Sequence, residues 1–366
     1  MRISQKPHLW LVALGAIVLA VGLAACGGGS SSSSASNEAG SSNEGGGEEA
    51  TTASSTETGT EGEGISGKSV WVVGCADAIP YCAGQNKTFE AVLGEAGADV
   101  TVVTSPYEAT KQAQQMDQAI AQNAEAIVLQ ALTVTPIIPQ LEKAKAAGIP
   151  VFLIDAPPPP ELPEGLYAAH IGGESVEQGE AAATALIKGM EEAGSTSGNV
   201  IVVGGASADT TTPARVEGFE KVLSGTSFKV VAEEDAEWDP VKAATIATQL
   251  LAKYGNKDGG VQGIYGMSGD MAASIAKAAQ QSGYEVGAEK GGMVVVGSNC
   301  SPRSIAEIKD GLVYADLQQS PVYVSEKASE VIIEALEGKE IEDEYVLPTP
   351  TIEKSNVQKY AKACTF

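Results

Sequence analysis

The residue with the clearest chemical potential is Asp155, an acid that directly follows the apolar run Val151–Ile154. This run is short, rich in β-branched and aromatic residues and followed by Pro157–Pro160, which is typical of a strand buried on both faces. In open α/β sheets the carboxyl ends of the strands face the ligand crevice, so a carboxylate there can accept hydrogen bonds from a bound hydroxyl. An Asp before prolines also commonly begins a turn, and the residues alone leave both interpretations open.

The other reactive side chains do not form a recognisable catalytic set. His170 is the only histidine that remains once the N-terminal segment is removed, which leaves one possible partner for a Ser or Cys nucleophile. The chain has no Gly-x-Ser-x-Gly elbow, and Gly204-Gly205-Ala206 lacks the rest of a dinucleotide fingerprint. A zinc site needs several Cys or His ligands, and only Cys75 and Cys82 are close in sequence. We therefore expect a protein that is not an enzyme and has neither cofactor nor metal.

Strands that alternate with helices are expected to position these residues. Helical periodicity, as in Ala113, Met116 and Ile120, fills the intervals between apolar runs. Such alternation implies an α/β fold with parallel sheets and right-handed crossovers. The pattern runs once up to Ile171 and begins again at Ser175, which predicts two similar lobes. The predicted strands are Ser69–Val73, Val100–Val103, Ala126–Leu129, Val151–Ile154, Val200–Val203, Phe228–Val231, Met293–Val296 and Val313–Leu317.

Length and charge narrow the classes of protein further. About 300 residues follow Gly67, which is too long for one ordinary core and again favours two lobes. The formal net charge of the 366-residue chain is −24, from 23 basic and 47 acidic residues. Nucleic-acid binding needs basic patches, so we expect no nucleic-acid partner.

The N-terminal segment has the features of an export signal. Basic Arg2 and Lys6 precede an apolar stretch that ends in Leu23-Ala24-Ala25-Cys26. This ending resembles the lipobox of bacterial lipoproteins, which implies a signal peptide over residues 1–25 and acylation of Cys26 as the new N-terminus. Residues 26–66 are almost entirely Gly, Ser, Thr, Ala, Asn and Glu, which predicts a flexible acidic tether. We therefore expect an extracytoplasmic lipoprotein anchored to the cell membrane, since two acyl chains anchor stably.

A set of short motifs in the folded part resembles one known family. The chain is similar to the class I periplasmic binding proteins, nearest the ribose-binding branch of the solute receptors of ABC transporters. The resemblance covers nearly all of residues 68–360, and the order and spacing of the motifs are more specific than any one of them. They are Gly148-Ile-Pro-Val-Phe-Leu-Ile-Asp155, Arg215-Val-Glu-Gly-Phe219, Trp238-Asp239-Pro240, Gly269-Asp-Met-Ala272, Val294-Val-Val-Gly297 and Lys309-Asp-Gly311.

This resemblance implies two Rossmann-like lobes, joined by a hinge of three crossings and closing on a ligand. The expected N-terminal lobe comprises residues 67–171 and 320–347, and the C-terminal lobe comprises residues 172–319 and 348–366. The implied function is that of a substrate-binding subunit, with the permease subunits of the transporter as partners. We expect a monomer. A chemoreceptor or a receptor for a signalling ligand with the same fold remains an alternative, whereas a lactose-repressor-type regulator would carry a DNA-binding helix pair where this chain has the lipobox.

The ligand-binding residues are those that the family's motifs place in the cleft. The resemblance implies polar and aromatic contacts after the first strand, an acid after the fourth, a tryptophan that stacks on the sugar, polar groups after two later strands and a hinge glutamine. These fall on Asp77, Tyr81, Asp155, Trp238, Ser268, Asn299 and Gln319.

Two positions depart from the family's pattern and limit the choice of ligand. Ala156 stands where the family usually has an arginine, and Pro213 stands where it has a second one. We interpret Arg215 as mainly structural. Without those arginines ribose itself is less favoured and an anionic ligand has no partner. We expect a small neutral sugar or polyol. A cationic amine held between Trp238 and Tyr81 by cation–π attraction, with Asp77 and Asp155 opposite, is the alternative.

The four cysteines beyond Cys26 are expected to pair in an oxidising compartment. Cys75 and Cys82 flank the loop after the first strand. Cys300 follows Asn299, and the topology of the family returns the C-terminal tail, with Cys364, to the same lobe. We predict the disulfides Cys75–Cys82 and Cys300–Cys364, with free buried thiols as the alternative.

Overall fold

The computed structural model describes residues 64–366, except residues 107, 134, 159–160 and 256–258. The expected signal peptide, Cys26 and nearly all of the expected tether lie outside the described residues. Ile65, at the end of the expected tether, is 1% exposed and belongs to the hydrophobic cluster that contains Val70 and Phe89. The packed part of the chain therefore begins at least two residues before Gly67.

The elements of the first half build one sheet and the helices around it. The strands are β1 (Ser69–Cys75), β2 (Asp99–Ser105), β3 (Ala126–Leu129), β4 (Val151–Ile154) and β5 (Ala169–Gly172). The helices are α1 (Pro80–Glu95), α2 (Ala109–Ala121), the 3₁₀ helix η1 (Thr135–Ile137) and α3 (Ile138–Ala146). With β11 (Glu344–Val346) from near the C-terminus, the strand order is β11-β5-β4-β3-β1-β2, and every pair is parallel.

The second half builds a second six-stranded sheet in the order β12-β10-β9-β8-β6-β7. All its pairs are parallel except β10 with β12, which is antiparallel. The strands are β6 (Gly198–Gly204), β7 (Phe228–Asp235), β8 (Val261–Gly266), β9 (Val294–Val296), β10 (Ala315–Leu317) and β12 (Thr351–Glu353). The helices are α4 (Ser175–Glu192), α5 (Thr211–Leu223), α6 (Pro240–Tyr254), α7 (Gly269–Gln281), α8 (Pro302–Asp310), α9 (Pro321–Leu336) and α10 (Val357–Tyr360).

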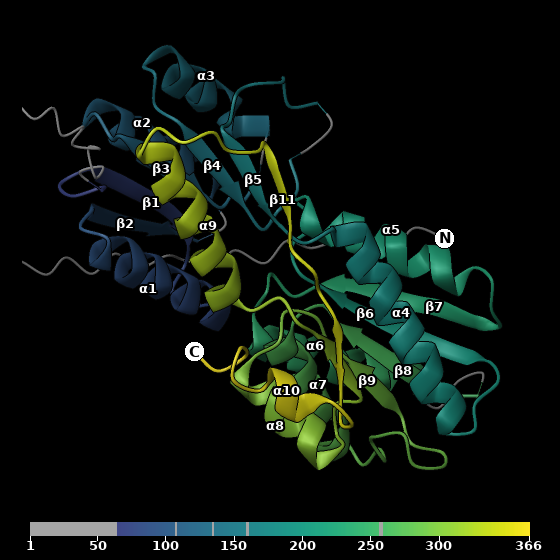
Figure 1. The fold of residues 1–366 in the computed structure, drawn as a ribbon. Helices are drawn as coiled ribbons and strands as arrows, with labels where there is room; N and C mark the ends of the chain where they lie inside the picture. Colours follow the sequence, from purple (N-terminus) through teal and green to yellow (C-terminus); the bar gives the residue numbers. More distant parts are fainter. Residues whose placement is uncertain (1–63, 107, 134, 159–160, 256–258) are drawn as a thin grey trace, which may run out of the picture. The chain divides into compact units, whose positions relative to one another are not determined.

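Three segments connect the two sheets, namely β5 to α4, β10 to α9 and β11 to β12. The helix α9 follows the second of these and packs against α1 beside the first sheet (Figure 1). The two parallel-sheet lobes and the three crossings confirm the predicted α/β fold class. The residue limits that we assigned to the two lobes remain a prediction.

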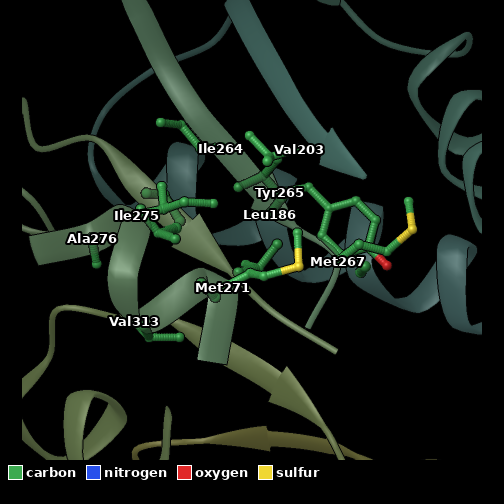
Figure 2. Close-up of a cluster of buried hydrophobic side chains, with 14 of the residues drawn as sticks. Leu186, Val203, Ile264, Tyr265, Met267, Met271, Ile275, Ala276 and Val313 are labelled. Atoms are coloured by element: carbon green, nitrogen blue, oxygen red, sulfur yellow. The ribbon is translucent and has the colours of Figure 1, made fainter. Parts of the chain in front are cut away.

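Alternating side chains of β1 pack into two different hydrophobic cores, as expected for a strand buried on both faces. Trp71 and Val73 pack with residues of α2 and α3, whereas Val70 and Val72 pack with residues of α1 and α9. In the second lobe one large cluster joins α4, α7 and the central strands. Figure 2 shows its side chains, among them Leu186 from α4, Ile264 from β8 and Met271 from α7.

The eight predicted strands all occur, and β3 and β4 have the predicted limits. Four further strands were not predicted, because their residues do not form apolar runs. The strand β5 contains His170 and ends in glycine, and β8 contains Gln262 and two glycines. The edge strands β11 and β12 have three residues each and mixed polarity. Pairing with a neighbouring strand, rather than local composition, determines these four.

Candidate functional site

A pocket lies at the carboxyl ends of the parallel strands of both sheets. The first sheet contributes segments that follow β1, β3 and β4, and the second contributes segments that follow β6, β7, β8 and β9. Gln319, which follows β10 in the connection to α9, completes the wall. This is the position at which open α/β sheets bind ligands, since the strand ends leave a crevice between the following loops.

The carboxylate of Asp155 is the centre of the hydrogen bonds on the first-sheet side of the pocket. Oδ1 accepts hydrogen bonds from Tyr81 Oη at 2.9 Å and from Gln319 Nε2 at 3.1 Å. Oδ2 accepts from Gln85 Nε2 at 2.6 Å and from Gln130 Nε2 at 3.3 Å. A carboxylate offers about four acceptor positions, so these four donors occupy it fully.

Burial and hydrogen bonding shift the pKa of Asp155 in opposite directions. The side chain is 7% exposed, and desolvation raises its pKa, while the hydrogen bonds from Gln85 and Tyr81 oppose the rise. The pKa of Tyr81 is also raised, chiefly by burial and then by the neighbouring Asp155 charge. The phenol therefore stays protonated and donates to the carboxylate, which fixes the orientation of the Tyr81 ring.

Gln130 is the side chain that this arrangement leaves incompletely satisfied. Its Nε2 donates to Asp155, which directs the amide oxygen Oε1 away from that bond. Oε1 is buried and has no hydrogen-bond partner in the structure, alone among the described residues that line the pocket. An unpaired buried acceptor costs free energy, and a hydroxyl donor from a bound molecule would remove that cost.

Arg215 of α5 connects the second-sheet side of the pocket to the hinge. Its Nη2 donates to Asn299 Oδ1 at 2.6 Å, its Nη1 to the carbonyl oxygen of Met267 at 3.0 Å and its Nε to Gln178 Oε1 at 2.8 Å. The amide of Gln178 then donates to the amide oxygen of Gln319. We interpreted Arg215 from the sequence as mainly structural, and these bonds agree with that, but the residue also lines the pocket.

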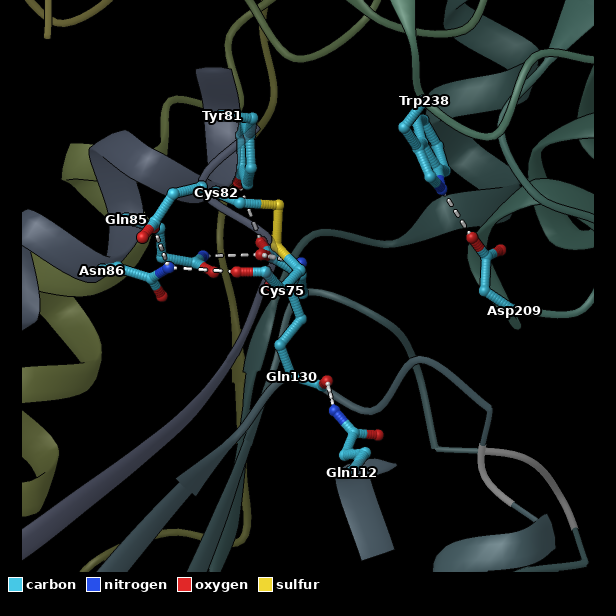
Figure 3. The surroundings of a disulfide bond; sticks show 11 residues. Cys75, Tyr81, Cys82, Gln85, Asn86, Gln112, Gln130, Asp209 and Trp238 are labelled. Atoms are coloured by element: carbon cyan, nitrogen blue, oxygen red, sulfur yellow. Dashed lines mark hydrogen bonds between the residues drawn. A yellow bond between two sulfur atoms is a disulfide. The ribbon is translucent and has the colours of Figure 1, made fainter. Parts of the chain in front are cut away.

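Trp238 and Asp209 form a second buried pair at the pocket wall (Figure 3). The indole Nε1 donates to Asp209 Oδ2 at 2.8 Å, and Asp209 Oδ1 accepts from the backbone N–H of Thr212 at 2.7 Å. The indole is 9% exposed and lies against Gly205, where a Cβ atom would come within 2.1 Å of the ring. Burial raises the pKa of Asp209. The ring is thus held by one hydrogen bond and by a glycine.

Three of the pocket residues have the left-handed backbone conformation that non-glycine residues seldom adopt. They are Asp155 with φ +62°, Trp238 with φ +61° and Asn299 with φ +56°. Such conformations cost about 1–3 kcal/mol each and persist where the surroundings determine them. All three line the same pocket, Asp155 on its first-sheet side and Trp238 and Asn299 on its second-sheet side, which makes this pocket the candidate functional site on grounds independent of its hydrogen bonds.

Most of the ligand-binding residues expected from the sequence line the pocket, namely Tyr81, Asp155, Trp238, Ser268, Asn299 and Gln319. Ser268 also caps α7, because its hydroxyl accepts a hydrogen bond from Met271 N at 3.2 Å. Asp77 does not line the pocket. It is exposed, and its Oδ1 accepts from Asn86 Nδ2 at 2.8 Å. The segment after β1 turns into α1 at Pro80, so its pocket residues come from the start of that helix and Asp77 stays outside.

Sequence reasoning missed several residues of the wall. Gln130, Asp209 and Thr211 follow β3 and β6, and Asp270 lies at the start of α7. For Gln130, Asp209 and Thr211 the position beyond a predicted strand was the available signal, although polar residues are common in all such loops. Asp270 follows β8, which was not predicted. Phe366 also lines the pocket, and no pattern in the sequence connects it to the site.

Both expected cysteine pairs are bonded in the structure. The Cα atoms of Cys75 and Cys82 are 5.5 Å apart, and both residues are buried beside Leu132. Figure 3 shows the disulfide next to Tyr81. The Cα atoms of Cys300 and Cys364 are also 5.5 Å apart. Each disulfide therefore joins a segment next to a pocket residue to another part of the chain.

The charged residues of the wall exclude some ligands. Asp155, Asp209 and Asp270 face a single cation, Arg215, whose three nitrogens already have acceptors. An anion would meet an excess of negative charge. Within the described residues no cluster of three or more Cys, His, Asp or Glu side chains could hold a metal ion. The helices of this described part are also all too short or too polar to span a bilayer.

Comparison with known proteins identifies the family. A family model described as a periplasmic binding protein domain matches residues 70–340. The chain belongs to this family. As a periplasmic binding protein it is extracytoplasmic and binds rather than transforms its ligand, which confirms the expectation that it is not an enzyme.

Characterised relatives of this periplasmic binding protein include two sugar import proteins. The ribose import binding protein of Bacillus subtilis is 26% identical over 263 residues, which cover 72% of this chain and 80% of the relative. The fructose import binding protein of Bifidobacterium longum is 25% identical over 296 residues, which cover 80% of this chain and 86% of the relative. A solute binding protein from Actinobacillus succinogenes with bound D-allose has a TM-score of 0.71 at 20% identity and covers 80% of this chain and 100% of that one. The last likeness concerns the fold alone.

Proposed function

We propose that this periplasmic binding protein holds one small neutral sugar or polyol in the pocket and delivers it to the permease subunits of an ABC importer. The observation that carries the proposal is the composition of the wall. A tryptophan ring held by Asp209 lies in the same pocket as Gln130, whose oxygen lacks a donor, and as Tyr81, which Asp155 orients. Sugars present both an apolar C–H face and hydroxyl groups, and small-molecule sites combine apolar surface with a few fixed polar groups.

Relatives with sugar names support the same ligand class. The ribose and fructose import binding proteins each match more than two thirds of this chain. The absence of a free cation in the described wall also fits a neutral ligand better than a sugar phosphate or a carboxylate. We propose that Asp155 acts on the ligand mainly by orienting Tyr81, Gln130 and Gln319, since its own acceptor positions are occupied.

Closure of the two lobes on the ligand is part of this proposal. Tyr81 and Asp155 follow strands of the first sheet, whereas Trp238 and Asn299 follow strands of the second. A ligand that contacts both groups of residues favours the state in which they are close, and its differential affinity sets how far the population shifts.

A small cationic amine is the second candidate ligand, and one observation favours it. Three carboxylates face one arginine in the wall, and the pocket is also lined by the aromatic residues Trp238 and Tyr81, although the Arg215 guanidinium already lies 5.8 Å from the centre of the Trp238 ring. Two further observations favour the sugar. Asp77, expected opposite the aromatic pair, lies outside the pocket, and the carboxylate of Asp155 is already saturated by four donors.

A thermal-shift panel separates the two candidates. A ligand that binds only the folded state raises the unfolding midpoint with concentration. Ribose, fructose, xylitol and glycerol represent the first class, and choline and tetramethylammonium the second. We expect at least one sugar or polyol to raise the midpoint and both amines to leave it unchanged. A response to choline alone would replace the sugar proposal by the amine alternative.

We propose that Cys26 is lipidated and anchors the chain to the membrane. The lipobox-like Leu23-Ala24-Ala25-Cys26 and the polar segment that follows support this. Changing Cys26 to Ala is expected to move the protein from the membrane fraction to the soluble fraction, because both acyl chains are lost. Fractionation followed by immunoblotting measures this, and continued sedimentation of the variant with the membranes would contradict lipid anchoring.

A further inference from the structure

The C-terminal tail places an aromatic ring in the pocket wall. Phe366 lines the pocket together with Tyr81, at the start of α1, and Trp238, which follows β7, but it belongs to neither of those segments. It follows α10 by six residues, at the end of the tail seen beyond that helix in Figure 1. Its side chain is 37% exposed, which makes it one of the few large apolar side chains exposed in the described structure.

A disulfide ties this tail to the second lobe. Cys364, two residues before Phe366, is fully buried and bonded to Cys300, which is also fully buried. Cys300 directly follows the pocket residue Asn299, and its N–H donates to the carbonyl oxygen of Leu317 in β10 at 3.0 Å. The C-terminal tail is therefore fixed at a point next to the pocket, and only one residue lies between the bonded Cys364 and Phe366.

The ring of Phe366 lies against a helix of the first lobe. A Cβ atom added to Gly84, in the second turn of α1, would come within 2.6 Å of Phe366 Cδ2 and 3.2 Å of Cγ. Because Gly84 has no side chain, the Phe366 ring can lie directly against the helix backbone. The same helix carries Tyr81 and Cys82, which also line the pocket.

We propose that Phe366 is a ligand-contacting residue, which the Cys300–Cys364 disulfide holds over the pocket as an aromatic wall between the two lobes. The ring would cover the apolar C–H face of a bound sugar or polyol, and the ligand would in turn cover the exposed part of the ring. Because the tail is bonded to one lobe and rests on the other, the ring must leave Gly84 when the lobes separate. Phe366 therefore retards ligand release.

The ligand contact rests on the proposed function, but the position of the ring can be tested without a ligand. Acrylamide is a small neutral quencher of tryptophan fluorescence, and Trp238 lines the same pocket. In the full-length chain with Trp10→Phe and Trp71→Phe, Trp238 is the only tryptophan. If Phe366 covers the pocket, Phe366→Ala raises the Stern–Volmer constant of Trp238. If the Trp71→Phe background does not fold, the variants are compared with Trp71 present, since that buried ring adds a constant signal.

Gly84→Ala displaces the ring from the opposite side without altering a pocket residue or the tail. The added methyl group collides with the movable end of the Phe366 side chain, and alanine favours the helix, so the variant folds. Gly94→Ala in the same helix is the matched control, because nothing lies within 4 Å of its Cβ position. Val241→Ala is the control for loss of an exposed apolar side chain, since Val241 is 75% exposed outside the pocket.

We expect Phe366→Ala, Gly84→Ala and the double variant Cys300→Ser with Cys364→Ser to raise the quenching constant by similar factors, and the two controls to leave it unchanged. For whichever of ribose, fructose and xylitol binds, the first three variants should raise Kd about tenfold, mainly through faster dissociation.

Unchanged quenching in Phe366→Ala, or equal quenching in Gly84→Ala and Gly94→Ala, would overturn the proposed wall. If the quenching changes but Kd does not, Phe366 covers the pocket without touching the ligand and the proposed contact is wrong. Failure of all three sugars to bind, with the quenching result intact, would instead refute the proposed ligand class.

Discussion

The carboxylate of Asp155 is buried, accepts four side-chain hydrogen bonds and belongs to a residue in a left-handed conformation. The hydrogen bonds offset the free-energy cost of burying the charge. The charge is expensive to bury unless it is hydrogen-bonded. The four donors supply those bonds and are themselves held in place by the carboxylate. One acid thus organises the polar groups of half the pocket.

Replacing Asp155 by Asn tests this organising function. Asn tolerates the left-handed conformation, so the backbone is retained. One acceptor oxygen becomes a donor that faces other donors, and hydrogen bonds to a charged group are worth about 1.5–3 kcal/mol. We expect the unfolding midpoint to fall and the affinity for the bound sugar or polyol to decrease roughly tenfold or more, measured by thermal melting and calorimetry.

Asp77→Asn provides the control for this change, since Asp77 is exposed and lies outside the pocket. It should leave ligand affinity within about twofold, as exposed substitutions away from a site usually do. If Asp77→Asn weakened binding as much as Asp155→Asn, Asp77 would belong to the site in solution, as the sequence predicted.

Asp316 of β10 is a second buried acid, and its ionisation should make stability depend on pH. Burial raises the pKa of Asp316 from 3.8 to about 7, and Oδ2 has no hydrogen-bond partner in the structure. The folded state therefore binds more protons than the unfolded state between these two pH values. The free energy of unfolding then falls as the pH rises from about 4 to 7, at up to ~1.4 kcal/mol per pH unit.

Asp316→Asn should remove this dependence. The amide keeps an acceptor for the backbone N–H of Leu317 and resembles the protonated acid. Guanidinium denaturation at pH 5 and pH 8 gives the comparison. We expect the variant to be more stable than the parent at pH 8 and closer to it at pH 5. A stability difference between parent and variant that is the same at pH 5 and pH 8, or that shifts in favour of the parent at pH 8, would show that the folded state does not raise the pKa of Asp316.

At the scale of elements, two glycines let α4 and α5 cross at backbone contact. A Cβ atom at Gly218 would lie 2.0 Å from the carbonyl oxygen of Val176, and one at Gly179 would lie 2.0 Å from that of Arg215. The crossing brings Gln178 of α4 next to Arg215 of α5, which produces the bond from the pocket wall towards the hinge. The position of Arg215 is therefore a property of the helix pair.

Gly218→Ala is expected to destabilise the protein by roughly 1–3 kcal/mol, the usual cost of forcing apart a packed contact. This loss should exceed the ~1 kcal/mol that alanine gains in helix propensity. Denaturant unfolding measures the difference. Gly94→Ala, with no atom near its Cβ position, should instead be neutral or stabilising. Equal stabilisation by both substitutions would mean that α4 and α5 do not touch at this point.

The sequence predicted the strands that consist of a continuous apolar run. The apolar runs Ala126–Leu129 and Val151–Ile154 are strands with the predicted limits. The strand Ala169–Gly172 contains a buried histidine, whose Nδ1 is 2.7 Å from Glu344 Oε1 on the adjacent β11, and this long-range partner cannot be read from the neighbouring residues. The same limit applies to the site. Asp155 was predicted because it ends an unmistakable strand, whereas Phe366 reaches the pocket through a disulfide and a glycine that are distant in sequence.

At the scale of the whole molecule, the three connections between the sheets meet around one glycine. A Cβ atom at Gly173 would approach Gln178 Nε2, Thr349 Cγ2 and Gln319 Oε1 within 2.2, 2.8 and 3.1 Å. Each of these side chains lies in or next to a different connection. Gln319 also donates to Asp155, so polar groups of the pocket are bonded directly to the hinge. Under the proposed closure, these bonds would connect a ligand that contacts both sides of the pocket to the segments that join the two sheets.

Isothermal titration calorimetry on the full-length chain and on Trp238→Ala tests whether a neutral sugar or polyol binds in this pocket. We predict that such a ligand binds the parent chain with a stoichiometry of one. We also predict that the substitution weakens binding at least about 30-fold, as loss of a central aromatic contact of ~2 kcal/mol would, while the protein still unfolds cooperatively. Undiminished affinity in Trp238→Ala would contradict binding in this pocket, and heat only from choline or tetramethylammonium would contradict the ligand class.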